Sequence, residues 1–230
     1  MNGSPPTPDF IAAQLRKPSG DFAATIAQTM DKTNEFLFGL TLQSMDLQGD
    51  EHLLEIGFGS GRFLHKLFSQ RGAIRVHGID YSPEMVALAR ETNGDLVNTG
   101  VLALEEGHSG NLPFDDEAFD MAFCNMVIYF WDNPDEHLRE VWRVLGPAGT
   151  FYAGFRTKES MMHAPFVRYG FHLHTQKEWK ALLERNGFVL LRTVSKTDPT
   201  LEMNGQRIQL ESVCMVAQKS SRLRGQEDGA

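Results

Sequence analysis

Cysteine is scarce in this sequence: Cys124 and Cys214 are the only two. Two cysteines cannot form a disulfide framework, and by themselves they cannot complete the four-ligand shell of a structural zinc site. We therefore predict no metal site and a reducing environment, so that the expected location is cytoplasmic. The polar residues 1–9, which include three prolines, do not resemble a signal peptide and agree with this expectation.

Long hydrophobic runs and positive charge are also in short supply. No apolar run approaches the roughly 18 residues of a membrane-spanning helix, so we expect no membrane span. The 22 Lys and Arg stand against 30 Asp and Glu, a formal net charge of −8. Nucleic-acid-binding proteins usually carry a clustered basic surface, so this balance argues against nucleic acid as a partner. The 230 residues are 41% hydrophobic, with 16 phenylalanines, which is enough for the core of one domain.

Short apolar runs alternate with amphipathic segments in most of the chain. Strands are predicted at 53–56, 74–79, 102–104, 121–124, 150–155, 188–194 and 207–217. Helices are predicted after several of them, as at Ser82 and Pro83, which supply an N-cap and a first helical residue. This alternation favours an α/β fold with a doubly wound parallel sheet. The segment 197–205 is too short for a crossover helix, so we predict seven mostly parallel strands with the last one antiparallel.

Four parts of the chain follow from composition and apolar spacing. We predict a flexible tail at 1–20, capping helices at 21–48, an α/β domain at 49–218 and a flexible tail at 219–230. The capping helices are indicated by apolar residues that recur every four positions, beginning with Phe22, Ile26 and Met30. We expect these N-terminal helices to cover the ligand cleft of the α/β domain.

Three glycines at alternate positions, Gly57, Gly59 and Gly61, follow the first predicted strand. Glycine permits the positive φ angles of a tight turn and lets a ligand approach the backbone. The following helix directs its free N–H groups at such a ligand, and ligands of doubly wound sheets bind at this end of the strands. Alone, the glycines are a weak signal, because an ordinary strand-to-helix turn can also use them.

Neighbouring charged residues separate this loop from a nicotinamide-dinucleotide site. Arg62 stands where the dinucleotide fingerprint has its third glycine, and Glu55 stands at a position that is normally apolar there. A carboxylate at that position suits a nearby cationic group of the ligand. Asp80 ends the second predicted strand, where a carboxylate can accept hydrogen bonds from a ribose diol. These residues indicate a nucleoside ligand with a cationic group near Glu55.

With these motifs the sequence resembles the class I S-adenosylmethionine-dependent methyltransferases over about residues 50–217. Four segments carry the resemblance in the family's order: LEIGFGSG at 54–61, GIDYSPEM at 78–85, the stretch 107–120 with LPF and AFD, and LGPAGT at 145–150. The resemblance implies a Rossmann-like methyltransferase fold and S-adenosylmethionine as the cofactor. It also implies transfer of the methyl group by in-line displacement to an acceptor that is mostly a small molecule.

The resemblance further implies which residues hold the cofactor. Glu55 and the glycine loop would line its methionyl and ribose parts, Asp80 would hold the ribose hydroxyls and Tyr81 would lie against the adenine. Asn125 would lie near the sulfonium. The full predicted set is Glu55, Gly57, Phe58, Gly59, Gly61, Asp80, Tyr81, His108, Ser109 and Asn125.

The adenine end departs from the family's pattern. His108 stands where members often have an aspartate that accepts from the adenine amino group. A neutral imidazole can still accept one hydrogen bond, and the Ser109 backbone N–H could reach an adenine nitrogen. The alternative for His108 is a solvent-facing loop residue.

Acceptor-binding residues are predicted beside the cofactor. They are Tyr129 and Trp131 after the fourth strand, and Arg156 and His163 at and after the fifth. The alternative for the aromatic pair is ordinary core packing. No catalytic residue is predicted, because a sulfonium makes its methyl group electrophilic and alignment of the nucleophile supplies much of the rate.

Two other functions stay open, and the cofactor carboxylate has several candidate partners. Arg62 and Glu55 argue against a nicotinamide-dependent oxidoreductase. A non-catalytic S-adenosylmethionine-binding regulatory protein would share every cofactor residue, so sequence does not exclude it.

Arg16, Lys17 and Lys32 could bind the carboxylate of the cofactor or could be solvated surface charges. We expect an enzyme, monomeric or homodimeric, with a small-molecule acceptor.

Overall fold

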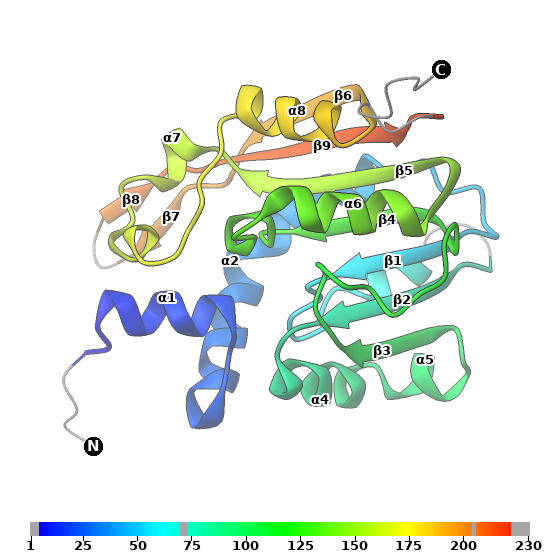
Figure 1. Ribbon diagram of the computed structural model, residues 1–230. Coiled ribbons are helices and arrows are strands. Elements are labelled where there is room, and N and C mark those ends of the chain that lie inside the picture. Colours follow the sequence, from blue (N-terminus) through cyan, green and yellow to red (C-terminus); the bar gives the residue numbers. More distant parts are fainter. Residues whose placement is uncertain (1–4, 70–72, 204–205, 222–230) are drawn as a thin grey trace.

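A seven-stranded sheet forms the centre of the protein (Figure 1), as seen in a computed structural model that describes residues 5–69, 73–203 and 206–221. The strand order is β3-β2-β1-β4-β5-β9-β6. The strands are β1 (His52–Ile56), β2 (Arg75–Asp80), β3 (Leu102–Glu106), β4 (Phe119–Asn125), β5 (Leu145–Arg156), β6 (Phe188–Thr197) and β9 (Glu211–Lys219). Neighbours from β3 to β5 pair in parallel, whereas β9 pairs antiparallel with β5 and β6. The predicted fold class is confirmed, and the last strand is the antiparallel one.

Helices cover both faces of this sheet. They are α1 (Pro8–Arg16), α2 (Ala23–Gln43), α3 (His65–Phe68), α4 (Pro83–Thr92), α5 (Gly94–Asn98), α6 (Pro134–Val144), α7 (Lys158–Met161) and α8 (Gln176–Arg185), with short 3₁₀ turns η1 (Gly20–Phe22), η2 (Ile128–Phe130) and η3 (Pro165–Arg168). The Ser82 cap is formed as predicted, since its side chain accepts from the Met85 N–H. At the start of α8, Thr175 with Glu178 forms a capping box.

Two hydrophobic cores result, because successive residues of a strand point to opposite faces. Leu53 packs with Leu37 and Phe38 of α2, on the face that α3 and α4 also cover. Its neighbour Leu54 packs on the other face with Leu138 of α6 and the residues of α8. The central strands are therefore buried on both sides, which is typical of parallel sheets.

The N-terminal region differs from its prediction. Residues 8–16, predicted as part of a flexible tail, form α1, which packs against α2 and η3. Ala12 and Gln14 of α1 are buried, and Gln14 exchanges two hydrogen bonds with Ser19. The partners of α1 lie up to about 150 residues away in the chain, so local composition did not indicate an ordered helix.

The predicted capping helices form one helix, α2. Its N-terminal half packs through Ala23 and Ala27 against Met85 of α4, and its C-terminal half packs through Leu37 and Phe38 on the sheet. The two halves of α2 therefore differ in their packing partner, and the helix continues without a break between them. Figure 1 shows α1 and the first half of α2 beside the carboxyl ends of β1, β2 and β4.

The C-terminal part contains two further differences. The segment between β6 and β9 holds a small hairpin of β7 (Leu201–Met203) and β8 (Gln206–Ile208). The loop predicted at 197–205 thus contains β7, and the strand predicted at 207–217 is divided between β8 and β9. Lys219, predicted to begin the C-terminal tail, ends β9, and its Nζ donates to the Leu145 carbonyl. Residues 1–4 and 222–230 of the predicted tails lie outside the described part of the chain.

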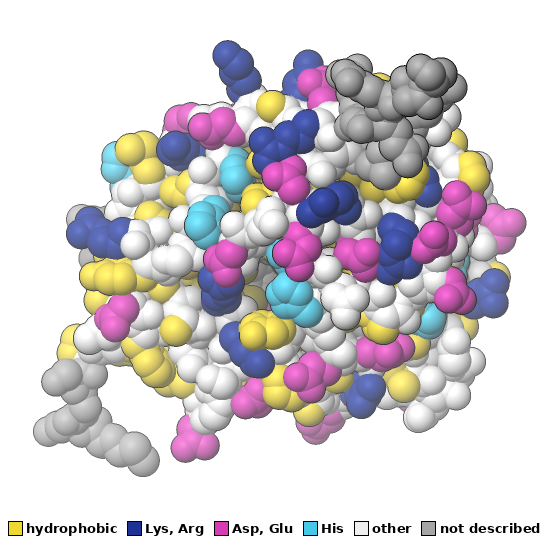
Figure 2. All heavy atoms as spheres, viewed as in Figure 1, with side chains coloured by type: hydrophobic (Ala, Val, Ile, Leu, Met, Phe, Trp, Pro, Cys, Tyr) yellow, Lys and Arg dark blue, Asp and Glu magenta, His cyan; other side chains and the backbone are white. Residues whose placement is uncertain are grey.

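Charge is mixed on the surface that faces the viewer in Figure 2, where acidic and basic side chains are interspersed with histidines. Within the described ranges, none of the helices combines the length and the apolar composition needed to cross a membrane.

Candidate functional site

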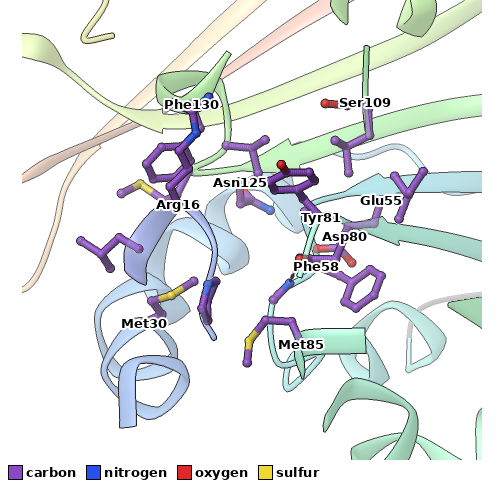
Figure 3. A pocket seen from close by; sticks show the side chains of 18 of the residues that line it. Arg16, Met30, Glu55, Phe58, Asp80, Tyr81, Met85, Ser109, Asn125 and Phe130 are labelled. Atoms are coloured by element: carbon purple, nitrogen blue, oxygen red, sulfur yellow. Dashed lines mark hydrogen bonds between the residues drawn. The ribbon is translucent and has the colours of Figure 1, made fainter. Parts of the chain in front are cut away.

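A cavity of about 320 Å³ opens at the carboxyl ends of β1, β2 and β4, beneath α1 and α2 (Figure 3). Nine of the ten residues predicted to bind the cofactor line it: Glu55, Gly57, Phe58, Gly59, Asp80, Tyr81, His108, Ser109 and Asn125. Gly61 is the exception. A Cβ at Gly61 would lie 2.7 Å from Ala89 Cβ and 2.8 Å from Asn93 Nδ2, so this glycine allows the loop to pack closely on α4.

The glycine loop presents its backbone to the cavity. Gly57 and Gly59 have φ angles of 73° and 57°, which favour glycine. A Cβ at Gly57 would lie 2.4 Å from Val127 Cγ2, whereas a Cβ at Gly59 would meet only Met30 Cε, at 3.8 Å. Gly57 therefore permits a close approach within the protein, whereas the space beside Gly59 is open.

Asp80 holds the glycine loop in position from the end of β2. Its Oδ2 accepts a hydrogen bond from the Gly59 N–H at 2.8 Å, and its Oδ1 accepts from the Ser82 N–H at 2.9 Å. Burial raises the pKa of Asp80 to about 6, although these backbone donors act in the opposite direction. The carboxylate thus connects the loops that follow β1 and β2, and it also lines the cavity.

Glu55 lies deeper, at the end of β1. Its side chain is almost completely buried, and its Oε2 has no hydrogen-bond partner in the described structure. Burial, and then the nearby Asp80 carboxyl, raise the pKa of Glu55 to about 8. A buried, unpaired acceptor is costly unless a ligand satisfies it, so Glu55 indicates a ligand that donates hydrogen bonds or carries positive charge.

Asn125 ends β4 on the same side of the sheet. The Thr41 hydroxyl of α2 donates to Asn125 Oδ1 at 2.6 Å, which fixes the orientation of the amide. The Asn125 Nδ2 is buried and has no partner in the described structure, so it can donate to a ligand. Thr41 was not predicted, because a threonine inside a helix gives no sign of its partner 84 residues away.

Histidines gather at the end where adenine was predicted. His108 lines the cavity, and its ring lies 5.1 Å from that of His137 in α6. His137 Nδ1 lies 2.8 Å from Ser109 Oγ, and its ring stacks on Trp131 at 4.7 Å with an interplanar angle of 2°. Burial, followed by His108, lowers the pKa of His137 to about 4, so this ring is neutral at pH 7. His137 was not predicted, since it sits among the ordinary polar residues of a helix.

An ion pair connects α1 to the segment after η2 at the edge of the cavity. Arg16 of α1 forms a bidentate pair with Asp132, whose Oδ1 also lies 3.1 Å from His172 Nε2. Because of these partners the pKa of Asp132 falls to about 2. Lys17 Nζ lies 4.0 Å from the centre of the Tyr81 ring. Arg16 lines the cavity, whereas the third candidate for the cofactor carboxylate, Lys32, is exposed.

The predicted acceptor residues have different surroundings. Trp131 lines the cavity but is buried against His137. Tyr129 is fully buried, and its hydroxyl contacts the backbone of Arg156. The Arg156 guanidinium pairs with Asp198 and donates to the Thr33 carbonyl. The structure therefore gives Tyr129 and Arg156 structural positions outside the cavity lining, which corrects their prediction as acceptor residues.

His163 is also placed away from the cavity lining, as an exposed residue between α7 and η3. The cavity wall opposite Glu55 and Asp80 is formed by residues of α2 and of the segment after β4. Figure 3 shows Met30 and Phe130 across the cavity from Glu55 and Asp80. The remaining members of this wall are Asn34, Phe38 and Met126.

One further carboxylate, Asp31 of α2, lines the cavity. Its Oδ1 accepts from Ser60 Oγ at 2.6 Å, and burial raises its pKa above the ordinary value. Among the described residues, no cluster of three or more His, Cys, Asp or Glu side chains could hold a metal ion.

The site fits a cationic nucleoside such as S-adenosylmethionine. Glu55 Oε2 and Asn125 Nδ2 are buried polar atoms that a ligand can satisfy, and the space beside Gly59 accepts ligand atoms. The carboxylate of Asp80 lies where ribose hydroxyls can donate to it. Among the described residues that line the cavity, four are acidic (Asp31, Glu55, Asp80 and Asp132) and one, Arg16, is an arginine or lysine, so the lining suits a positively charged molecule better than a phosphate.

Comparison with known proteins identifies the domain. Residues 54–153 match the family model described as methyltransferase domain. A demethylmenaquinone methyltransferase of Deinococcus radiodurans is 31% identical over 97 residues, which are 42% of this chain and 39% of that protein. A ubiquinone/menaquinone biosynthesis C-methyltransferase of Geobacter is 31% identical over 109 residues, covering 47% of this chain and 46% of that protein. The matched region therefore spans less than half the length of these relatives.

Solved structures share the fold over a longer stretch. A Haloferax volcanii protein, determined in complex with the Trm112 methyltransferase activator, has a TM-score of 0.73 at 22% identity, covering 84% of this chain and 93% of its own. A SAM-dependent methyltransferase of Methanosarcina mazei has a TM-score of 0.59 at 23% identity, covering 76% of this chain and 95% of its own. At these identities the likeness concerns the fold. The matched domain, the sheet order and the motifs around the cavity together support a class I S-adenosylmethionine-dependent methyltransferase with S-adenosylmethionine as its cofactor.

Proposed function

We propose that this protein transfers the methyl group of S-adenosylmethionine to a small, largely apolar acceptor. The observation that carries the proposal is the cavity that joins Glu55, Asp80 and the open side of Gly59 on one wall to an apolar wall on the other. The first wall offers partners for a cationic nucleoside, and the second offers contact for an acceptor. We further infer a cytoplasmic protein, on the reasoning from cysteine content.

Positioning is the main task of the residues in this mechanism. The bound cofactor supplies an electrophilic methyl group. Asp80 and the loop at Gly59 hold the ribose, Asn125 orients the region near the sulfur, and α1 with α2 excludes water from above. Holding two reactants in line can lower a barrier by about 7–11 kcal/mol, so no covalent step on the protein is required.

The acceptor wall favours an apolar molecule of adaptable shape. Met30 and Met126 have flexible, polarisable side chains that adjust to irregular surfaces, and Phe130 and Phe38 add aromatic area. Asp31 follows Met30 directly in the sequence and also lines the cavity. We infer that its carboxyl group faces the polar group of the acceptor.

Cofactor binding is tested with Asp80→Ala. We expect calorimetry to show binding of S-adenosylmethionine to the wild type and at least tenfold weaker binding to Asp80→Ala, since hydrogen bonds to a charged group contribute roughly 1.5–3 kcal/mol. Asp95→Ala, which removes an exposed carboxylate of α5, is the matched control and should bind normally. Wild-type protein that binds NAD but neither S-adenosylmethionine nor its demethylated product would refute the proposal.

Methyl transfer is tested separately from binding. The protein is incubated with methyl-labelled cofactor and fractionated pools of small apolar metabolites, and label in an acceptor is the expected result. Binding without label in any pool would instead favour a non-catalytic cofactor-binding protein.

A further inference from the structure

Two asparagine side chains line the cavity, and the protein itself holds the amide oxygen of each. The Thr41 hydroxyl donates to Asn125 Oδ1 at 2.6 Å. Arg156 Nη1 donates to Asn34 Oδ1 at 3.3 Å, and the Thr33 hydroxyl donates to the same oxygen at 3.4 Å. An amide group has an oxygen that accepts and an NH₂ group that donates two hydrogen bonds. With both oxygens engaged, the NH₂ groups are the ends left for a ligand.

The bond between Thr41 and Asn125 depends on a glycine of β5. A Cβ at Gly154 would lie 2.0 Å from Asn125 Oδ1 and 2.6 Å from Thr41 Oγ1. Any larger side chain at this position would displace the hydrogen-bonded pair, so the glycine makes room for it. Three elements, α2, β4 and β5, therefore fix the orientation of the Asn125 amide together.

The two NH₂ groups lack partners within the described part of the chain. Asn125 Nδ2 is buried without a hydrogen bond, and Asn34 Nδ2 donates to none of the described residues. Figure 3 shows Asn125 between Phe130 and Tyr81. An unpaired buried donor is costly, so a ligand atom that accepts hydrogen bonds is expected here. A positively charged sulfur is a poor partner for an N–H donor, which leaves the methyl acceptor to supply this atom.

We propose that the methyl acceptor carries a phenolic or enolic hydroxyl group, whose oxygen accepts hydrogen bonds from Asn34 and Asn125. This inference rests on the proposed function and names the acceptor class of the same site. Thr41 and Arg156 are then positioning residues, because their hydrogen bonds keep the two amides in the donating orientation. An amine would present N–H donors of its own and would need oxygen atoms at these points, but both amide oxygens are already used.

A hydroxyl group also suits the carboxyl group on the same helix. Asp31 and Asn34 are three residues apart on α2, and residues at this spacing are neighbours on a helix surface. A hydroxyl can donate its hydrogen to the Asp31 carboxyl while its oxygen accepts from the amides. A ketone offers the oxygen without the hydrogen, so it satisfies only one of the two groups.

The inference is tested with 2-naphthol and 2-naphthylamine, which share a ring system and are both uncharged at pH 7. Calorimetry measures their binding to the full chain saturated with the demethylated product of the cofactor. We expect 2-naphthol to bind about threefold to tenfold more tightly, which is the range of one net hydrogen bond. In nuclear magnetic resonance spectra, the side-chain NH₂ signals of Asn34 and Asn125 should shift more with 2-naphthol than with the amine.

Thr41→Val keeps the size of the side chain and removes the hydroxyl that orients Asn125. It should reduce the preference for 2-naphthol to about twofold or less, and Thr41→Ser should restore it. Thr29→Val is the matched control, because Thr29 is an exposed threonine of the same helix whose hydroxyl donates to the Thr25 carbonyl. Asn125→Asp places an oxygen where the donor was and should favour the amine.

Equal binding of the two probes by the wild type, or no binding of 2-naphthol, would overturn the inference. An unchanged preference in Thr41→Val, together with weaker binding of the demethylated product, would assign the amides to the cofactor and overturn it as well. Failure of the wild type to bind either S-adenosylmethionine or its product would instead contradict the proposed function. The wild-type comparison and the two Thr41 variants decide the question even if Asn125→Asp does not fold.

Discussion

Gly57 and Gly59 offer a matched pair of substitutions that separates loop stability from ligand binding. Both have positive φ angles, 73° and 57°, so alanine at either position pays the same kind of backbone strain. That strain is about 1–2 kcal/mol for one residue. The surroundings differ: a Cβ at Gly57 would lie 2.4 Å from Val127 Cγ2, whereas a Cβ at Gly59 would have only Met30 Cε within 4 Å.

The expected stabilities follow from this difference. Gly57→Ala adds an overpacking cost of about 1–3 kcal/mol to the strain, because Val127 must move. Its total loss is therefore about 2–5 kcal/mol, against about 1–2 kcal/mol for Gly59→Ala. In a chain of this size each kcal/mol lowers the melting temperature by roughly 2–4 °C. For binding we expect Gly59→Ala to weaken S-adenosylmethionine at least about tenfold, because its methyl group fills the space left for the ligand.

Denaturant unfolding measures the stabilities, and calorimetry measures the affinities. Val127→Ala removes the atom that a Cβ at Gly57 would meet, so the double variant Gly57→Ala/Val127→Ala should recover part of the stability in a double-mutant cycle. Equal destabilisation by the two glycine substitutions, with no coupling to Val127, would refute the steric reasoning. Wild-type affinity in Gly59→Ala would show that the ligand does not approach this loop.

Three further predictions concern stability. Arg156→Ala should lower the free energy of unfolding in urea by about 3–5 kcal/mol, because Asp198 is left buried and unpaired. The double variant Arg156→Met/Asp198→Leu should lose less stability, since it removes both charges. A loss below about 1 kcal/mol for the single variant would contradict a buried pair. His137 has a folded-state pKa of about 4, below its ordinary 6.5, so its neutral form contributes stability that is complete above pH 6.5 and decreases as the pH falls toward 4. By pH 5 this loss is up to about 2 kcal/mol, and His137→Gln should show a correspondingly flatter pH dependence between 7.5 and 5. Thr175→Ala breaks the capping box of α8 and should lower the free energy of unfolding by about 0.5–2 kcal/mol without changing cofactor affinity.

The strands and the cofactor loops could be predicted because their signals are local. Glu55, Gly57 and Gly59 lie on one turn at the end of one strand, and Asp80 ends the next, so parallel pairing alone brings them to the same edge. Nine of the ten predicted residues line the cavity for this reason. Gly61 is the exception. Its spacing predicts a residue that faces the ligand, but in the structure it packs closely against Ala89 of α4.

The acceptor side could not be predicted in the same way. Arg156 and Tyr129 follow strand ends, as functional residues often do, but the structure buries them against Asp198 and each other. Met30 and Phe38, which line the cavity, read in the sequence as ordinary apolar positions of a helix. Whether an apolar residue faces a core or a cavity depends on the partner that its helix meets, and no local pattern specifies that partner.

The amino-acid sequence by itself determined the alternation of strands and helices, the antiparallel last strand and the edge of the sheet at which the predicted cofactor residues meet, because hydrophobic periodicity and turn chemistry act over a few residues. Only the tertiary structure decided that α1 is ordered, that Arg16 and Asp132 bridge the entrance and that Glu55 is left without a partner. Those features depend on contacts between segments far apart in the chain and on how much water their packing removes.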